Sequence, residues 1–258
     1  MFKIFKNNNK ITKKINQMKK IIKITAVLVL FTTFFTSCVI NSGVKGNGQT
    51  KTESREINSG ITNIEVSNAL DVKLTQGENP KLEVTADSNI LQYIETSQDG
   101  NTLTIGIKDH LGLQDFEATI YLTLPNIYNI STSSAASVKG KNTLITKELT
   151  LKTSSSSSIE LALETEHLSV DSSSASEVIL SGKAINTQFE SSSSSSIKAG
   201  SLKANNVIAK SSSASSIACY PILNLDAKAS SSGSVSFWNK PKYIKKEESS
   251  AGIVSQSE

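Results

Sequence analysis

The feature that most constrains the fold is a repeat of about 20 residues in the second half of the chain. Seven similar segments each lead from a cluster of Ser, Ala or Gly into a β-branched anchor residue, with 18 to 21 residues between successive anchors. The anchors are Val138, Ile159, Val178, Ile197, Ile217, Val235 and Ile253. A fixed period of this length with short strands is typical of a solenoid. The repeat therefore predicts a parallel β-helix whose coils stack about 4.8 Å apart.

Fixed positions relative to each anchor predict which side chains face the core. Four residues before the anchor every repeat has Ser, and two residues before it the side chain is always small. The anchor and the residue two further on, such as Ile159 and Leu161, should face inward, because side chains alternate along a strand. A second inward column, eight residues before the anchor, contains Ile130, Leu151, Val170, Phe189 and Ala209. This column becomes polar in the last coil, so we expect an irregular C-terminal cap with Trp238 and Tyr243 covering the open end.

Short alternating runs precede the repeat and predict additional strands. They cover residues 61–66, 70–74, 82–84, 103–107 and 119–124. Alternation of apolar and polar residues between Gly, Asn, Asp or Pro indicates strands, and no long stretch has helical periodicity. We therefore expect an all-β protein in which N-terminal strands lead into coils of 18–21 residues, with a single domain over residues 56–258.

Serine is unusually abundant, with 43 of 258 residues. Scattered serine would favour disorder, but 32 of these residues lie between positions 131 and 236, in register with the repeat. A small side chain fits where a coil turns tightly, and a hydroxyl can bond to its neighbours in a stack or to corner backbone groups. The serines are therefore interpreted as part of the turns. The two Cys residues exclude a disulfide scaffold.

The N-terminal segment has the pattern of a signal peptide. Residues 1–37 contain eight Lys and no acidic residue, and an apolar run over residues 21–35 leads to Thr-Ser and then Cys38. Met18 is a candidate start. The arrangement resembles a bacterial lipobox, except that Phe35 replaces the usual aliphatic residue, so Cys38 is predicted to be lipidated. An uncleaved anchor is the alternative, although about 15 residues is short for a bilayer. Residues 38–55, polar and Gly-containing, would then form a flexible tether.

Removal of the signal peptide changes the sign of the net charge. The whole chain carries +4, but without residues 1–37 there are 19 basic against 23 acidic residues, a net charge of −4. The basic character of the whole chain therefore gives no indication of a nucleic-acid partner. The expected location is the bacterial cell envelope, at the outer membrane and attached through lipid, with the periplasmic or surface orientation left open.

At this point the sequence resembles the head GIN domain family of auto-transporter adhesins, which is common in lipoproteins of Bacteroidetes. The resemblance is carried by strand patterns at residues 55–57, 64–77, 82–87, 103–105 and 121–125, which lead into the Ser-rich coils. It covers roughly residues 55–240. It implies a β-helical fold and a role in adhesion or in the cell envelope, and it supplies no catalytic residues.

Few residues qualify as candidates for chemistry. Cys219 lies two residues after an anchor and is expected to be a core thiol. His110 and His167 have no spaced Cys, His or Asp partner, so we expect surface histidines and neither a metal nor a cofactor. Asp171 and Glu190 occupy equivalent positions on consecutive coils and should lie about 5 Å apart, as a solvated charge ladder or as the paired carboxylates of a glycosidase. The charge ladder is favoured.

Outward serines offer a candidate contact surface. Ser158, Ser196 and Ser216 could form a flat array of hydroxyls for sugar or ice, although a purely structural role is favoured. The leading hypothesis is a non-enzymatic, lipid-anchored adhesin or contact module for glycans or matrix. The alternatives are an envelope-stress or structural protein without a dedicated ligand, and a polysaccharide-acting enzyme at Asp171 and Glu190.

Overall fold

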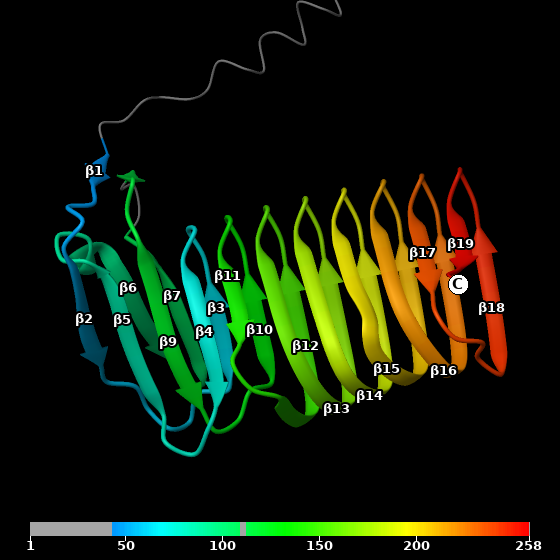
Figure 1. Cartoon of the computed structure of the whole chain (residues 1–258), viewed down its shortest axis with the longest axis horizontal. Coiled ribbons are helices and arrows are strands. Elements are labelled where there is room, and N and C mark those ends of the chain that lie inside the picture. The colour runs from blue at the N-terminus through cyan, green and yellow to red at the C-terminus, as the bar shows by residue number, and fades with distance from the viewer. Residues whose placement is uncertain (1–42, 109–111, 258) are drawn as a thin grey trace, which may run out of the picture. The chain divides into compact units, whose positions relative to one another are not determined.

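The computed structural model describes residues 43–108 and 112–257 (Figure 1). All regular elements there are strands apart from one 3-10 helix, η2 (Leu91–Tyr93). None of the described segments is a helix long and apolar enough to cross a membrane. The strands are β1 Val44–Lys45, β2 Thr50–Arg55, β3 Asn63–Val66, β4 Asp71–Gln76, β5 Lys81–Asp87, β6 Ile94–Asp99, β7 Thr102–Ile107, β8 Leu113–Gln114, β9 Ala118–Leu124, β10 Asn129–Thr132, β11 Ser137–Gly140, β12 Leu144–Thr153, β13 Ser158–Ser172, β14 Glu177–Ser191, β15 Ser196–Ser211, β16 Ser216–Ala229, β17 Ser234–Phe237, β18 Tyr243–Glu248 and β19 Ile253–Gln256.

The repeat folds as the predicted parallel β-helix. Each of β13, β14, β15 and β16 runs along one wall of the coil, bends, and returns along the other wall, and each pairs in parallel with the next. We call the wall that follows the tight turn wall A and the wall that follows the bend wall B. Wall A continues through β4, β11, β17 and β19, and wall B through β3, β10, β12 and β18. The tight turns align along one edge of the stack and the bends along the other (Figure 1).

The N-terminal end of the stack is closed by antiparallel strands. On wall A β5 pairs antiparallel with β9, and on wall B β6 pairs antiparallel with β7. The predicted tether over residues 38–55 is wrong at its C-terminal end, because residues 50–55 form β2 and pair antiparallel with β5. The guanidinium of Arg55 also donates to the carbonyl oxygens of Ile94 and Leu91 at 2.7 and 3.1 Å. An edge strand pairs through its backbone and is exposed on both faces, so β2 has no apolar alternation to reveal it.

Every coil turns through two consecutive residues in the left-handed region. In the turn over residues 154–157 the φ angles of Ser155 and Ser156 are 53° and 62°, and Ser157 N donates to Ser154 O at 3.2 Å. Positive φ at both central positions defines a type I′ turn. The equivalent pairs are Asn68 and Ala69, Ser134 and Ala135, Ser174 and Ala175, Ser193 and Ser194, Ser213 and Ala214, Ser231 and Ser232, and Ser250 and Ala251. Left-handed Ser or Ala costs about 1–2 kcal/mol per residue, so neighbouring interactions must offset this strain.

Two sets of hydrogen bonds offset the backbone strain of the left-handed turn residues. Successive turns bond to each other through their backbones, as where Ser156 N donates to Ser174 O at 3.0 Å. Beneath the turns lies a buried hydroxyl ladder, formed by Thr132, Thr153, Ser157, Ser172, Ser176, Ser191, Ser195, Ser211 and Ser215. The serine excess therefore has two structural origins, small side chains at the tips and hydrogen-bonded hydroxyls inside, as the sequence interpretation proposed.

The core consists of the predicted inward columns. Ile159 with Leu161, Val178 with Leu180 and Val235 with Phe237 are all buried. The second column is buried as well, from Ile130 to Ala209. The inner space between the walls is therefore filled with aliphatic side chains and two phenylalanines, Phe189 and Phe237.

The anchor predicted for the last coil is wrong by one residue. Ile253 is 59% exposed, whereas Val254 is buried and pairs with Val235. The preceding small position is Gly252, where a Cβ atom would lie 2.2 Å from the carbonyl carbon and oxygen of Ala229. The turn therefore requires glycine at the position that the alignment gave to Ala251.

The open end is covered differently from the prediction. Tyr243 is 72% exposed and does not cover the core, while Trp238 packs against Gly200. Instead Lys246 occupies the inward column of the last coil, opposite Ala227. Its Nζ lies 4.9 Å from the centroid of the Phe237 ring and donates to Val254 O at 3.3 Å. A lysine stem can cover an apolar ring while its ammonium stays at the surface.

Candidate functional site

The predicted contact serines share one outward column on wall A. Ser158 and Ser196 are half-buried and Ser216 is exposed, and Ser216 Oγ donates to Ser196 Oγ at 3.2 Å. Glu177 lies between Ser158 and Ser196 in this column and forms an ion pair with Lys198. The three hydroxyls therefore do not form an uninterrupted array. Cys38 and His110 lie outside the described residues.

The predicted core thiol is confirmed. Cys219 is fully buried between the walls, next to Phe237 in register. Burial raises the pKa of its thiol to about 12, because desolvation disfavours the thiolate. The thiolate is the reactive form, so this side chain has the properties of a core residue.

The paired carboxylates lie in a charge ladder on wall B. Asp171 and Glu190 are register partners, with Lys152 and Lys210 on the flanking strands. Lys210 Nζ lies 2.8 Å from Glu190 Oε1, and this hydrogen bond lowers the pKa of Glu190. A general acid on a glycosidic bond needs the opposite shift, towards neutral pH. The geometry therefore fits a structural ion pair better than a catalytic pair.

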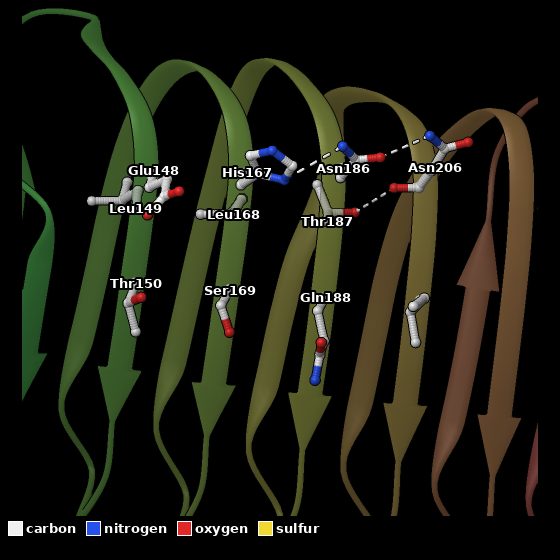
Figure 2. Close-up of a pocket in the computed structure, with 11 residues that line it drawn as sticks. Glu148, Leu149, Thr150, His167, Leu168, Ser169, Asn186, Thr187, Gln188 and Asn206 are labelled. Atoms are coloured by element: carbon white, nitrogen blue, oxygen red, sulfur yellow. Dashed lines mark hydrogen bonds between the residues drawn. The ribbon is translucent and has the colours of Figure 1, made fainter.

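The most distinctive polar surface lies beside the bend, on wall B. One residue per coil projects outward here, in the register column formed by Glu148, His167, Asn186, Asn206, Asn224 and Tyr243. The asparagines form a directional ladder, in which Asn224 Nδ2 donates to Asn206 Oδ1 at 2.5 Å and Asn206 Nδ2 donates to Asn186 Oδ1 at 2.8 Å. Asn186 Nδ2 lies 3.4 Å from His167 Nδ1 (Figure 2). Since the amide nitrogen can only donate, this contact is a hydrogen bond in the tautomer of His167 in which Nδ1 accepts.

A second outward column runs parallel to the ladder, two residues nearer the tight turn. It contains Thr102, Asn63, Asn129, Thr150, Ser169, Gln188, Ile208, Asp226 and Lys245. Asn129 Nδ2 donates to Asn63 Oδ1 at 2.7 Å, which extends the amide pairing to the first coils. We call the surface formed by the two columns the amide groove.

Three hollows follow one another along the amide groove. The central hollow, of about 320 Å³, extends from Glu148 to Ile208 (Figure 2). It shares Thr150 with a hollow of about 280 Å³ around Asn63 and Asn129. It shares Asn206 and Ile208 with a hollow of about 590 Å³ around Asn224 and Tyr243. Adjacent hollows therefore share lining residues from one end of the groove to the other.

The sequence contains a signal for this surface, which lies three residues beyond the inward column eight residues before each anchor. Counted forward from each anchor the asparagines fall at different offsets, because the bend varies in length. Counted back from the following anchor, His167, Asn186, Asn206 and Asn224 all lie eleven residues before it. The count that defines the inward columns therefore also places these four residues in one column.

Within the described residues no group of three or more His, Cys, Asp or Glu side chains is placed to hold a metal ion. His167 lies in the amide groove, where its ring contacts Asn186. The candidate site is therefore a polar binding surface of amides, hydroxyls and one exposed aromatic ring.

Comparison with known proteins identifies the family. The profile of the family described as "putative auto-transporter adhesin, head GIN domain" matches residues 60–241. The chain belongs to this family. This confirms the resemblance in the strand patterns, and the match includes almost all of the amide groove. No curated protein matches the sequence significantly.

Solved structures share the fold of this head GIN domain. A putative adhesin from Bacteroides fragilis is 22% identical, with a TM-score of 0.78 over 83% of this chain and 100% of that chain. A putative adhesin from Parabacteroides merdae is 19% identical, with a TM-score of 0.69 over 83% and 99% of the two chains. A protein from Parabacteroides distasonis described as a putative lipid binding protein is 21% identical, with a TM-score of 0.70 over 83% and 99%. At these identities the likeness establishes the fold alone.

Proposed function

We propose that the protein is a non-enzymatic adhesin of the cell envelope, anchored through lipid at Cys38, that contacts glycan or matrix through its outward columns. Membership of an adhesin family supports the general role. The observation that carries the proposal is the repetition of the same polar groups on successive coils of wall B. Many weak contacts in a fixed array suit a repetitive ligand, because linked contacts add to the avidity.

The absence of catalysis is part of this proposal. One member of the carboxylate pair that an enzyme would use, Glu190, is engaged by Lys210, which lowers its pKa. The amide groove offers hydrogen-bond donors and acceptors, and its one imidazole is already paired with Asn186. Replacing Asp171 with Asn and Glu190 with Gln should therefore leave binding to a glycan or matrix surface unchanged.

Two measurements on intact cells test the anchoring and the orientation. Metabolic labelling with an alkyne-tagged fatty acid should mark the wild-type chain and leave Cys38→Ser unmarked. Protease added to intact cells should then remove the domain from the surface, together with a known surface protein. Protection of the domain while that marker is removed would place it in the periplasm and overturn external adhesion.

A solid-phase assay tests the adhesion itself. The purified full-chain protein is applied to immobilised fibronectin, laminin and collagen, and to immobilised polysaccharides, and retention is compared with that on albumin. Saturable retention on at least one matrix or glycan surface is expected. Equal retention on all surfaces would contradict an adhesin and favour a structural envelope protein.

A further inference from the structure

We propose that the amide groove binds a linear, uncharged polysaccharide whose chain lies along the stack of coils. This inference rests on the proposed function, to which it adds a defined surface and a ligand chemistry. It differs from the hydroxyl array on wall A, because the amide groove lies on the opposite wall of the coil.

Each asparagine in the ladder keeps part of its hydrogen-bonding capacity. Asn206 uses one amide hydrogen towards Asn186 and one lone pair towards Asn224. A second hydrogen and a second lone pair remain on the same amide. Sugar hydroxyls both donate and accept, so the remaining pair on each amide matches their chemistry. The ladder also fixes the orientation of each amide, which reduces the entropy lost when a ligand binds.

The charge distribution favours an uncharged ligand. From Thr150 to Ile208, and from His167 to Asn224, the outward side chains of the groove are amides, hydroxyls, one imidazole and an isoleucine. Nearer the turn, Lys210 pairs with Glu190 at 2.8 Å, and Asp171 lies in register between Lys152 and Glu190. A polyanion would therefore meet no line of free cations along this part of the groove, and without residues 1–37 the chain has a net charge of −4.

The C-terminal hollow adds two features that suit a sugar. Tyr243 is the register partner of Asn224, and its side chain is 72% exposed on a strand of the stack. An exposed ring with a hydroxyl edge offers an apolar face for stacking and a polar handle. Asp226 lines the same hollow, where its Oδ2 lies 3.6 Å from Lys245 Nζ. A carboxylate oxygen has several lone pairs and can also accept from a sugar hydroxyl.

The length of the groove favours a polymer over a single sugar. Its second column crosses nine neighbouring strands, from Thr102 on β7 to Lys245 on β18. At about 4.8 Å per strand this is about 38 Å. A short oligosaccharide would occupy one hollow, whereas a chain would contact several in succession and gain affinity from each.

The test is affinity electrophoresis of the purified full-chain protein in gels containing dextran, laminarin, xylan or mannan, with heparin as the polyanion. We expect at least one neutral polymer, but not heparin, to retard the wild type. Tyr243→Ala and Asn206→Ala should each raise the apparent dissociation constant about fivefold to tenfold, through loss of the ring or of one amide. Tyr243→Phe keeps the ring and should recover most of the loss seen with alanine.

Matched variants separate this inference from the general adhesin proposal. Asn205→Ala removes an adjacent amide that lines a different hollow, and Tyr121→Ala removes a half-exposed ring on wall A; both should bind as the wild type. Equal thermal unfolding of all variants controls for folding. If only Ser196→Ala or Ser216→Ala weakens the binding of a neutral polymer, the amide groove is the wrong surface, while the proposal of glycan adhesion stands. If none of the polymers binds but a matrix protein does, the polysaccharide inference fails alone.

Discussion

The turn edge and the bend edge of the coil are built on different principles. At the turn edge every coil uses the same type I′ turn, and successive turns bond backbone to backbone, as where Ser194 N donates to Ser213 O at 3.0 Å. At the bend edge the register shifts between Ile179 and Ser181 and again between Ala199 and Lys203. The number of residues in a coil therefore varies only at the bend.

This difference separates the control of the spacing between coils from the choice of outward polar side chains. The stacked turns and their buried hydroxyls hold successive coils in register. The bend tolerates variation, and the amide ladder from His167 to Asn224 begins directly after it. A solenoid of this kind can change its contact surface beside the bend without changing the rise from coil to coil.

The largest expected effect comes from lengthening the turn. Insertion of one Gly between Ser193 and Ser194 should destabilise the domain by about 3–5 kcal/mol, because it breaks the turn bond, the bond to the next turn and the hydroxyl contacts of Ser195. Urea unfolding followed by circular dichroism measures this loss.

The matched insertion is placed at the bend edge. One Gly between Leu180 and Ser181 lengthens β14 where β15 already contains an additional residue. We expect a loss of about 1 kcal/mol or less, since a slightly longer loop costs little entropy. Equal losses for the two insertions would refute the separation between the edges.

Glycine at the bend gives the second largest effect. Gly182 has a φ of 111°, and a Cβ atom there would lie 2.1 Å from the carbonyl oxygen of Leu163. Gly182→Ala should therefore cost about 3 kcal/mol through the clash and the backbone strain. Gly100 also has a positive φ, of 56°, but open space around its Cβ position, so Gly100→Ala should cost only about 1 kcal/mol in the same assay. If Gly182→Ala loses no more stability than Gly100→Ala, the bend tolerates a change in backbone shape as well as a change in length.

A third prediction compares two serines of one turn. Ser195 is buried, and the carbonyl oxygens of Ser172 and Ser192 lie 2.6 and 2.8 Å from its Oγ and share its one hydrogen, whereas Ser193 is exposed at the tip. Ser195→Ala should cost about 2 kcal/mol because buried acceptors lose their donor. Ser193→Ala should change the free energy of unfolding by less than about 0.5 kcal/mol. Similar values for the two would show that the buried hydroxyl ladder does not hold the turn.

The same contrast explains which features the sequence could predict. Inward columns near the turn, such as Val178 with Leu180, were predicted because their distance from the serine cluster is constant. The last anchor failed because Ala251 and Gly252 are both small, so composition could not decide which one takes the inward position.

The features that escaped prediction lie away from the turn. The asparagine ladder was not predicted because its column faces outward and has no apolar pattern, and β2 was not predicted because an edge strand shows no apolar alternation. The side chain that packs over Phe237 is that of Lys246, and a prediction based on apolar residues does not identify a lysine in this position. Each of these depends on contacts between coils that one repeat does not encode.

The smallest expected effect concerns the charges that flank the turn edge on wall B. Lys245 and Lys228 lower the pKa of Glu247 to about 2, and Lys210 lowers that of Glu190. A carboxyl whose pKa is lower in the folded state stabilises the fold above its unfolded value of 4.5 and loses this contribution as the pH falls towards 2. The Glu190→Gln, Glu247→Gln double variant should therefore melt slightly below the wild type at pH 7, with a gap that narrows as the pH falls from 4.5 towards 2 and shrinks in high salt. If this loss of stability exceeds that of Ser195→Ala, the ion pairs and not the buried hydroxyl ladder hold the coils in register. If the loss is unchanged by acid, packing holds the register instead.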